Sequence, residues 1–135
     1  MSDLVASSVL IHNISIGTLL VLILYHYYVV SKVANFVQLA KKLKFTTPLF
    51  HSINAFTVYT GMVLSAYSKI FDFTTLIMIA ASLFLMISEI KRYKKMRVIT
   101  SSDDVSQNDF KIFAKKIYVM QISIIFIIYT ICELF

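Results

Sequence analysis

The sequence predicts an all-α fold, a polytopic membrane four-helix bundle that forms a single domain over residues 1–135. Of the 135 residues, 59% are hydrophobic and only 15% are charged. The mean hydropathy of +0.80 is too high for an ordinary water-soluble domain. Four apolar stretches approach the roughly 20 residues that a membrane-spanning helix needs. A content of two Gly, one Pro and one Cys excludes collagen, disulfide scaffolds and metal sites built from cysteine.

The four predicted transmembrane helices cover residues 4–30, 47–68, 73–90 and 116–135. The first stretch has no charged residue between Asp3 and Lys32, so it is long enough to cross a bilayer with some tilt. Only residues 69–72 separate the second stretch from the third, which makes these two helices antiparallel neighbours. The longer connecting segments, 31–46 and 91–115, are expected to be loops.

Local signals mark the approach to two of these helices. Thr46 or Thr47 suits the N-cap of the second helix, and Pro48 suits its first turn, where the missing N–H is not needed. Ser106, followed three residues later by Asp109, resembles a capping box ahead of the fourth helix. We therefore expect an interfacial turn to lead into that helix.

The basic residues lie almost wholly in or beside segments 31–46 and 91–115. By the positive-inside rule both segments are cytoplasmic, so both termini are non-cytoplasmic. The expected location is the cytoplasmic (inner) membrane of a bacterium. The same lysines and arginines predict contact with anionic lipid at the cytoplasmic loops, and no binding of nucleic acid.

Each predicted helix carries one stripe of polar and small residues at helical spacing, which indicates the face that turns into the bundle. The members are His12, Ser15, Leu19, Leu22 and His26 on the first helix, His51, Asn54, Val58, Gly61 and Ser65 on the second, Thr75, Met78, Ser82, Met86 and Glu89 on the third, and Tyr118, Gln121, Ile125 and Cys132 on the fourth. Most of these residues are interpreted as contacts that hold the helices together.

The three histidines are the candidate ligands of a cofactor, because ionisable residues are rare within membrane spans. His26 and His51 share a depth near the cytoplasmic ends of their helices, so they could ligate one haem iron from opposite sides. His12 lies roughly 21 Å from His26 along the same helix, too far to share a metal. The alternative for each is a ring near an interface, bonded to Ser, Asn or water. Asn54, one turn after His51, is placed to orient that ring.

Glu89 lies near the cytoplasmic end of the third helix, beside Lys91, Arg92 and Lys94. The simplest interpretation is an ion pair that reaches toward the interface. A proton-relay role for Glu89 is the alternative.

Five short motifs share a layout with a known family. They are Leu10-Ile11-His12, Ile23-Leu24-Tyr25, Thr60-Gly61, Ile90-Lys91-Arg92-Tyr93 and Phe110-Lys111-Ile112-Phe113. In this layout the chain resembles the HemJ-type protoporphyrinogen oxidases and the related copper-resistance-D-like membrane domains. The resemblance implies a helical bundle that binds b-type haem and oxidises a porphyrinogen, with His12 as the haem ligand. The chain departs from the family on the third helix, where Thr75 and Ser88 stand near the expected Lys and His, and at Ala114-Lys115-Lys116, which replaces Asn-Glu-Pro.

Two functions follow as expectations. The first is a membrane protein that binds b-type haem, with a redox role, through His12, His51 and His26 as candidate ligands of the haem iron. The second is a non-catalytic accessory or scaffold subunit of a larger membrane complex, with another membrane protein or a homo-oligomer as its partner. A transporter or channel would need an oligomer to form a pore.

Overall fold

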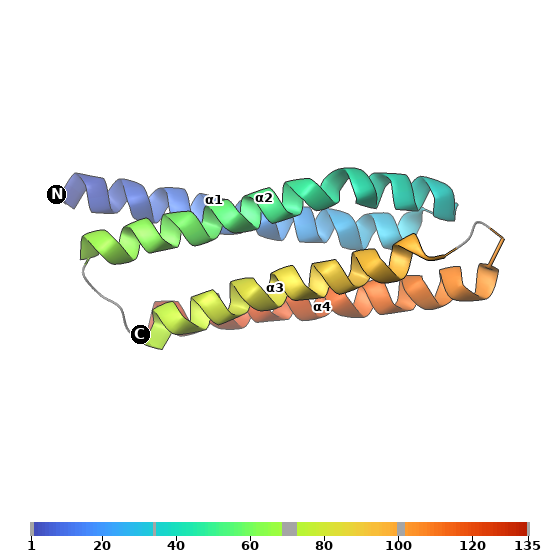
Figure 1. Cartoon of the computed structure of the whole chain (residues 1–135). Helices are drawn as coiled ribbons and strands as arrows, with labels where there is room; N and C mark the ends of the chain where they lie inside the picture. Colours follow the sequence, from blue (N-terminus) through green and yellow to red (C-terminus); the bar gives the residue numbers. More distant parts are fainter. Residues whose placement is uncertain (1, 34, 69–72, 100–101, 135) are drawn as a thin grey trace.

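The computed structural model describes residues 2–33, 35–68, 73–99 and 102–134, and these residues form four α-helices with no strand (Figure 1). The helices are α1 (Ser2–Lys32), α2 (Phe36–Ser68), α3 (Phe73–Arg97) and α4 (Asp104–Leu134). The predicted all-α class with four helices is confirmed.

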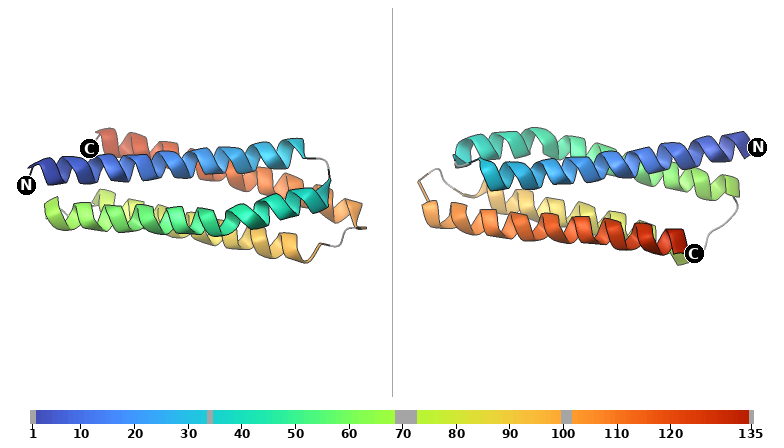
Figure 2. Two further views of the ribbon diagram at one scale, coloured as in Figure 1. Left: turned by 90° about the horizontal axis from the view of Figure 1, so that it is seen from above. Right: turned by 180° about the vertical axis from the view of Figure 1, so that it is seen from behind.

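The helices run up and down in a bundle in which each contacts its two neighbours. α1 packs against α2 and α4, and α3 packs against the same two helices. The two ends of the chain lie at the same end of the bundle, as Figures 1 and 2 show. The predicted antiparallel packing of the second and third helices is found in α2 and α3. We call the end that holds the two chain termini the terminal end, and the opposite end, where the lysines gather, the basic end.

The helices are longer than the predicted spans, and most of segments 31–46 and 91–115, expected as loops, is helical. α2 begins at Phe36 and α4 begins at Asp104. The reason is that core residues continue at helical spacing into the charged segments: Leu39 and Leu43 are fully buried on α2. Hydropathy marks where a helix is apolar all round, and a helix with one charged face continues beyond that point.

Side-chain caps begin both of these helices. Asn35 Oδ1 accepts hydrogen bonds from the backbone N–H of Val37 (2.9 Å) and of Gln38 (3.4 Å), which makes Asn35 the N-cap of α2. Asp103 Oδ1 accepts the backbone N–H of Ser106 (3.1 Å), and Asp103 Oδ2 accepts its hydroxyl (2.7 Å). The cap of α4 is therefore Asp103, and the predicted capping box of Ser106 with Asp109 is wrong by three positions.

Pro48 lies inside α2 and not in its first turn, so the predicted helix start at Thr46 or Thr47 is wrong. A proline inside a helix lacks an N–H and displaces the carbonyl four residues earlier, which bends the helix. The left view of Figure 2 shows α2 changing direction between its teal first part and its green remainder. Both threonines bond back to the preceding turn, since Thr46 Oγ1 donates to the Lys42 carbonyl (3.0 Å) and Thr47 Oγ1 to the Leu43 carbonyl (2.7 Å).

Two of the helices within the described residues are long and apolar enough to cross a membrane: Asp3–Lys32 in α1 and Asp104–Ile131 in α4. Burial is concentrated toward the basic end of the bundle. Among the side chains that the structure describes, α3 has no buried one before Leu85, and α4 has none after Gln121. The best-packed part of the core is therefore formed by the half of the bundle that also carries the basic residues.

The Asp103 cap makes the start of α4 sensitive to acid. Its two hydrogen bonds from Ser106, the backbone bond first, hold the pKa of the Asp103 carboxyl below its ordinary value of 3.8. Because the pKa is lowered in the folded state, the cap stabilises the start of α4 at pH values above the ordinary pKa. This stabilisation is lost as the pH falls through the lower pKa of the folded state. We expect the Ser106 amide signal in NMR spectra to move toward that of a frayed helix end on such acidification. Asp103→Asn should keep the cap and lose this pH dependence, and equal titration in both proteins would contradict the assignment.

Candidate functional site

Five polar or ionisable side chains are completely buried inside the bundle, each with 0% of its surface exposed. They are His26 of α1, Glu89 and Arg92 of α3, and Tyr118 and Gln121 of α4. Three hydroxyl groups contact them: Thr46 and Thr47 of α2 and Ser88 of α3. We call these eight residues the polar cluster. All four helices contribute to it. Tyr118 and Gln121 belong to the predicted inward stripe of the fourth helix, and His26 and Glu89 are the members for which a chemical role was considered from the sequence.

The polar cluster is centred on an ion pair. Arg92 donates to Glu89 Oε1 through Nε (2.9 Å) and Nη2 (2.6 Å), from one turn away on α3. The predicted pairing is present, but the pair is fully buried and does not reach the interface. Arg92 Nη2 also donates to Thr47 Oγ1 (2.7 Å), and its guanidinium lies 5.9 Å from the centre of the Tyr118 ring. A buried pair of this kind depends on such additional hydrogen bonds, because desolvation of both charges opposes it.

The three hydroxyls of the polar cluster are all oriented in the same way. The Ser88 hydroxyl donates a hydrogen bond to the Leu85 carbonyl (2.9 Å), just as the Thr46 and Thr47 hydroxyls donate to carbonyls of α2. Each hydroxyl oxygen therefore accepts from the cluster: Thr46 from His26 Nε2 (2.7 Å), Thr47 from Arg92, and Ser88 from Gln121 Nε2 (2.8 Å). This assigns the proton of a neutral His26 to Nε2 and leaves Nδ1 as an acceptor.

Four buried polar atoms of the cluster have no hydrogen-bond partner among the described residues: His26 Nδ1, Glu89 Oε2, Tyr118 Oη and Gln121 Oε1. Three of them are acceptors, and the Tyr118 hydroxyl is the one group that can donate. Arg92 donates to Thr47, to Glu89 Oε1 and to the Met96 sulfur (3.7 Å), and Gln121 donates to Ser88. Among the unpartnered atoms the acceptors outnumber the donors, so the interior is suited to a guest that donates hydrogen bonds, such as water or an added proton.

Apolar side chains enclose the polar cluster. The His26 ring packs against Tyr118 (centroids 5.4 Å apart) and Phe50 (6.3 Å). Toward the basic end lie Leu39, Leu43 and Phe110, all completely buried. The low polarity of these surroundings strengthens electrostatic interactions within the cluster.

His12 is held by its partner on α2. Its Nδ1 lies 2.9 Å from Thr60 Oγ1, and that hydroxyl donates to the Thr57 carbonyl (2.9 Å). The Nδ1 proton is therefore the donor, which leaves Nε2 of the neutral ring with its lone pair. Gly61 packs on the same ring, since a Cβ at this position would lie 3.1 Å from His12 Cε1. Two of the motifs that carry the family resemblance thus meet in space.

The other two histidines have different surroundings. His51 is half-buried and packs edge-on against Phe50 (5.7 Å). Asn54 does not orient His51 as expected, because it pairs with Ser82 of α3: Ser82 Oγ donates to Asn54 Oδ1 (2.9 Å), and Asn54 Nδ2 donates to the Ser82 carbonyl (3.2 Å). His26 has its Nε2 bonded to Thr46, and its ring is enclosed by Phe50 and Tyr118. Ligation of a haem iron by His26 would require those rings to move.

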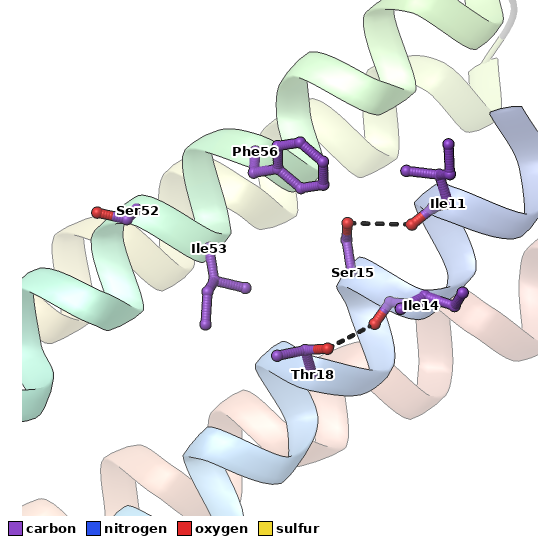
Figure 3. A pocket seen from close by; sticks show the side chains of 7 residues that line it. All are labelled: Ile11, Ile14, Ser15, Thr18, Ser52, Ile53 and Phe56. Atoms are coloured by element: carbon purple, nitrogen blue, oxygen red, sulfur yellow. Dashed lines mark hydrogen bonds between the residues drawn. The ribbon is translucent and has the colours of Figure 1, made fainter.

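A shallow groove of about 360 Å³ runs between α1 and α2 (Figure 3). Its walls are Ile11, Ile14, Ser15 and Thr18 of α1 with Ser52, Ile53 and Phe56 of α2. The Ser15 and Thr18 hydroxyls donate to the Ile11 and Ile14 carbonyls of their own helix (3.0 and 2.9 Å), as the dashed lines show. The groove is therefore apolar, and none of the three histidines lines it.

The part of the chain that the structure describes contains no group of three or more His, Cys, Asp or Glu side chains able to hold a metal ion together. Comparison of the chain with protein-family models, with curated proteins and with solved structures finds no match. The resemblance to the HemJ-type family and the haem-ligand role of the histidines stay predictions.

Removal of one charge from the buried pair tests the geometry of the polar cluster. Arg92→Met leaves the Glu89 carboxylate buried without its partner, and we expect it to lower the free energy of unfolding by about 3–5 kcal/mol. The double variant Glu89→Gln with Arg92→Met removes both charges and should recover most of that loss. Thermal and denaturant unfolding of the purified protein in mild detergent would measure both effects.

Lys91→Met is the matched control, because Lys91 is exposed on the same turn of α3. It should change the free energy of unfolding by less than about 0.5 kcal/mol. A loss for Arg92→Met no larger than that of the control would show that the pair is not buried as described.

Proposed function

We propose that this chain is an integral membrane protein that binds and transfers a proton at the polar cluster, as a subunit of a larger membrane complex. The four helices would form a polytopic bundle in a bacterial cytoplasmic membrane, with the basic end in the cytoplasm and both termini on the other side. The single observation that carries the proposal is the set of four unpartnered polar atoms buried among His26, Glu89, Tyr118 and Gln121.

The surface of the bundle supports the placement in a membrane. Large apolar side chains point outward along the two most apolar helices, including Val21 of α1 and Phe126 and Ile127 of α4, each more than half exposed. In water such a surface would drive aggregation, and in a bilayer it contacts lipid. At the basic end, exposed lysines such as Lys44 of α2 and Lys91 of α3 suit contact with anionic headgroups of the cytoplasmic leaflet.

The chemistry of the polar cluster supports proton transfer. Three of its side chains, His26, Glu89 and Tyr118, can each gain or lose a proton, and each has an unpartnered atom inside the cluster. Arg92 offsets the charge of Glu89, so the cluster has no net charge until one proton is added. An excess proton that enters the cluster can reside on His26 Nδ1 or on the Glu89 carboxylate, and on either group it supplies a donor where an acceptor is unpartnered. An arrangement that served only to hold the helices together would have no need of unpaired acceptors.

The proposal predicts that the cluster changes its protonation reversibly in the folded protein. We would record infrared difference spectra and imidazole ¹⁵N spectra of the protein in lipid nanodiscs from about pH 3 to about pH 9. We expect a change in the His26 ¹⁵N signals, together with a carboxyl or carboxylate infrared band that Glu89→Gln removes.

His51→Gln is the matched control, because His51 lies nearby on α2 but outside the polar cluster. This variant should leave the infrared band in place. If neither His26 nor Glu89 changes its protonation over this range while the fold stays intact, the cluster is structural and the proposal fails.

A second candidate function, b-type haem binding with a redox role, is favoured by one observation at His12. The Thr60 hydroxyl fixes the ring and leaves Nε2 with its lone pair, which is how proteins commonly prepare a metal-ligating histidine. When bound, the haem iron would supply one-electron chemistry. His51, half-buried, is the further candidate ligand.

Absorption spectra of protein purified from haem-supplemented cells, recorded oxidised and reduced, would test this second candidate. We expect a Soret band that His12→Ala abolishes and Thr60→Val weakens, since loss of the second-shell contact commonly lowers metal affinity about 10–100-fold. His26→Ala is the comparison and should leave the band in place, because the His26 ring is enclosed by Phe50 and Tyr118. A featureless spectrum of the folded protein after haem titration would remove this candidate.

A further inference from the structure

One face of α1 is left open by the rest of the chain. The helix buries His12, Ser15, Leu19, Leu22 and His26 against its neighbours α2 and α4. On another side it exposes Asn13 and, one turn further on, Gly17. Three apolar residues at helical spacing continue the same face: Leu10, Val21 and Leu24, which are 61%, 64% and 48% exposed.

The Asn13 amide is the first unusual feature of this face. The structure gives its side chain no hydrogen bond to any described residue. It lies roughly 15 Å along the helix from Asp3, well inside the stretch of α1 that has no charged residue. An amide has two donor hydrogens and a carbonyl acceptor, and in hydrocarbon each group left without a partner is unfavourable.

Several exposed hydroxyl groups on the apolar helices differ from the Asn13 amide, because each is hydrogen-bonded within its own helix. Thr18 donates to the Ile14 carbonyl (2.9 Å), Ser123 to the Val119 carbonyl (2.9 Å) and Thr130 to the Phe126 carbonyl (2.8 Å). These side chains can face lipid because their own helix satisfies them. The Asn13 amide lacks such a contact, so its hydrogen-bond partner must come from outside the described residues of this chain.

Gly17 is the second feature, and it is independent of the first. A Cβ added at Gly17 would meet no atom within 4 Å, so nothing in the described part of this chain requires a glycine there. The other glycine, Gly61, is explained by the His12 ring that packs on it. Glycine weakens a helix, but on a membrane helix it allows a second backbone to approach closely.

We propose that α1 forms a homodimer interface in which Asn13 and Gly17 meet their counterparts in a second copy of this chain. The inference rests on the membrane placement in the proposed function. Under a two-fold axis along the membrane normal, the two α1 helices run parallel and cross near Gly17. The two Asn13 amides then face each other one turn away.

A second copy is the occupant that the chemistry favours. An amide is its own complement, because the N–H of one copy can donate to the carbonyl oxygen of the other and the reverse bond forms by symmetry. A lipid acyl chain would cover the apolar residues and leave the amide unpaired. The face is also separate from the polar cluster, so the dimer leaves that site unchanged.

The test is to measure the oligomeric state of the full chain in bilayers by single-molecule photobleaching over a range of protein-to-lipid ratios. We expect dimers. Asn13→Leu should raise the dissociation constant about tenfold, in line with an interhelical hydrogen bond in a membrane, and Gly17→Ile should raise it further by blocking close approach. Asn13→Gln keeps the amide and should retain most of the association. Ser123→Leu is the matched control, because this exposed hydroxyl is already satisfied on α4.

The outcomes separate this inference from the placement on which it depends. Extraction of the wild-type chain from membranes by alkaline carbonate would overturn the membrane placement and the dimer together. A chain that stays inserted but is monomeric at every ratio overturns the dimer alone. Dimers that Asn13→Leu and Gly17→Ile leave unchanged would also overturn it. Circular dichroism should show the same helix content in all variants, since both side-chain positions are exposed in the protomer.

Discussion

The burial of Arg92 beside Glu89 is the constraint on which the rest of the bundle depends. Two charges without solvent are tolerated only where further hydrogen bonds reach them, and Thr47 of α2 supplies one. Thr46 and Thr47 directly precede Pro48, where α2 bends and where each hydroxyl bonds back to a carbonyl of its own helix. This single turn of α2 therefore provides acceptors to two neighbours, to His26 of α1 and to Arg92 of α3.

The same hydrogen bonds close the ring of helices. His26 joins α1 to α2, Arg92 joins α2 to α3, Gln121 joins α4 to α3, and the contact between the His26 and Tyr118 rings joins α1 to α4. Each hydroxyl in the set donates its hydrogen bond to a backbone carbonyl, so its oxygen accepts a hydrogen bond from another side chain of the cluster. The unpaired acceptors follow from this arrangement. The contacts that fix the register of the helices also leave acceptors unpaired at the place where we propose that a proton binds.

The number and order of the helices could be predicted from the sequence, because four apolar stretches with few charged residues admit few other structures. The true ends of the helices could not be predicted. Mean hydropathy falls where a helix gains one charged face, even though its other face, with Leu39 and Leu43 in α2, stays buried. The polar site was predictable only in part. The stripe of polar and small residues predicted that His26 faces the interior, where it is fully buried, but its partner, Thr46 and not His51, depends on helix rotation. Arg92 stands in a run of basic residues, where only its position one turn from Glu89 and on the inward face distinguishes it from its exposed neighbours.

The two sides of α1 show how one helix can serve both an interior and an exterior contact. His12 and Asn13 are adjacent in sequence and so point about 100° apart around the helix. The interior side chain, His12, finds Thr60 within its own chain and a glycine that makes room for its ring. The exterior side chain, Asn13, has an equally strong need for hydrogen bonds and also has a glycine nearby, but no partner within the chain as described. If the bilayer is the solvent, the same physical requirement that pairs His12 with α2 pairs Asn13 with another protomer.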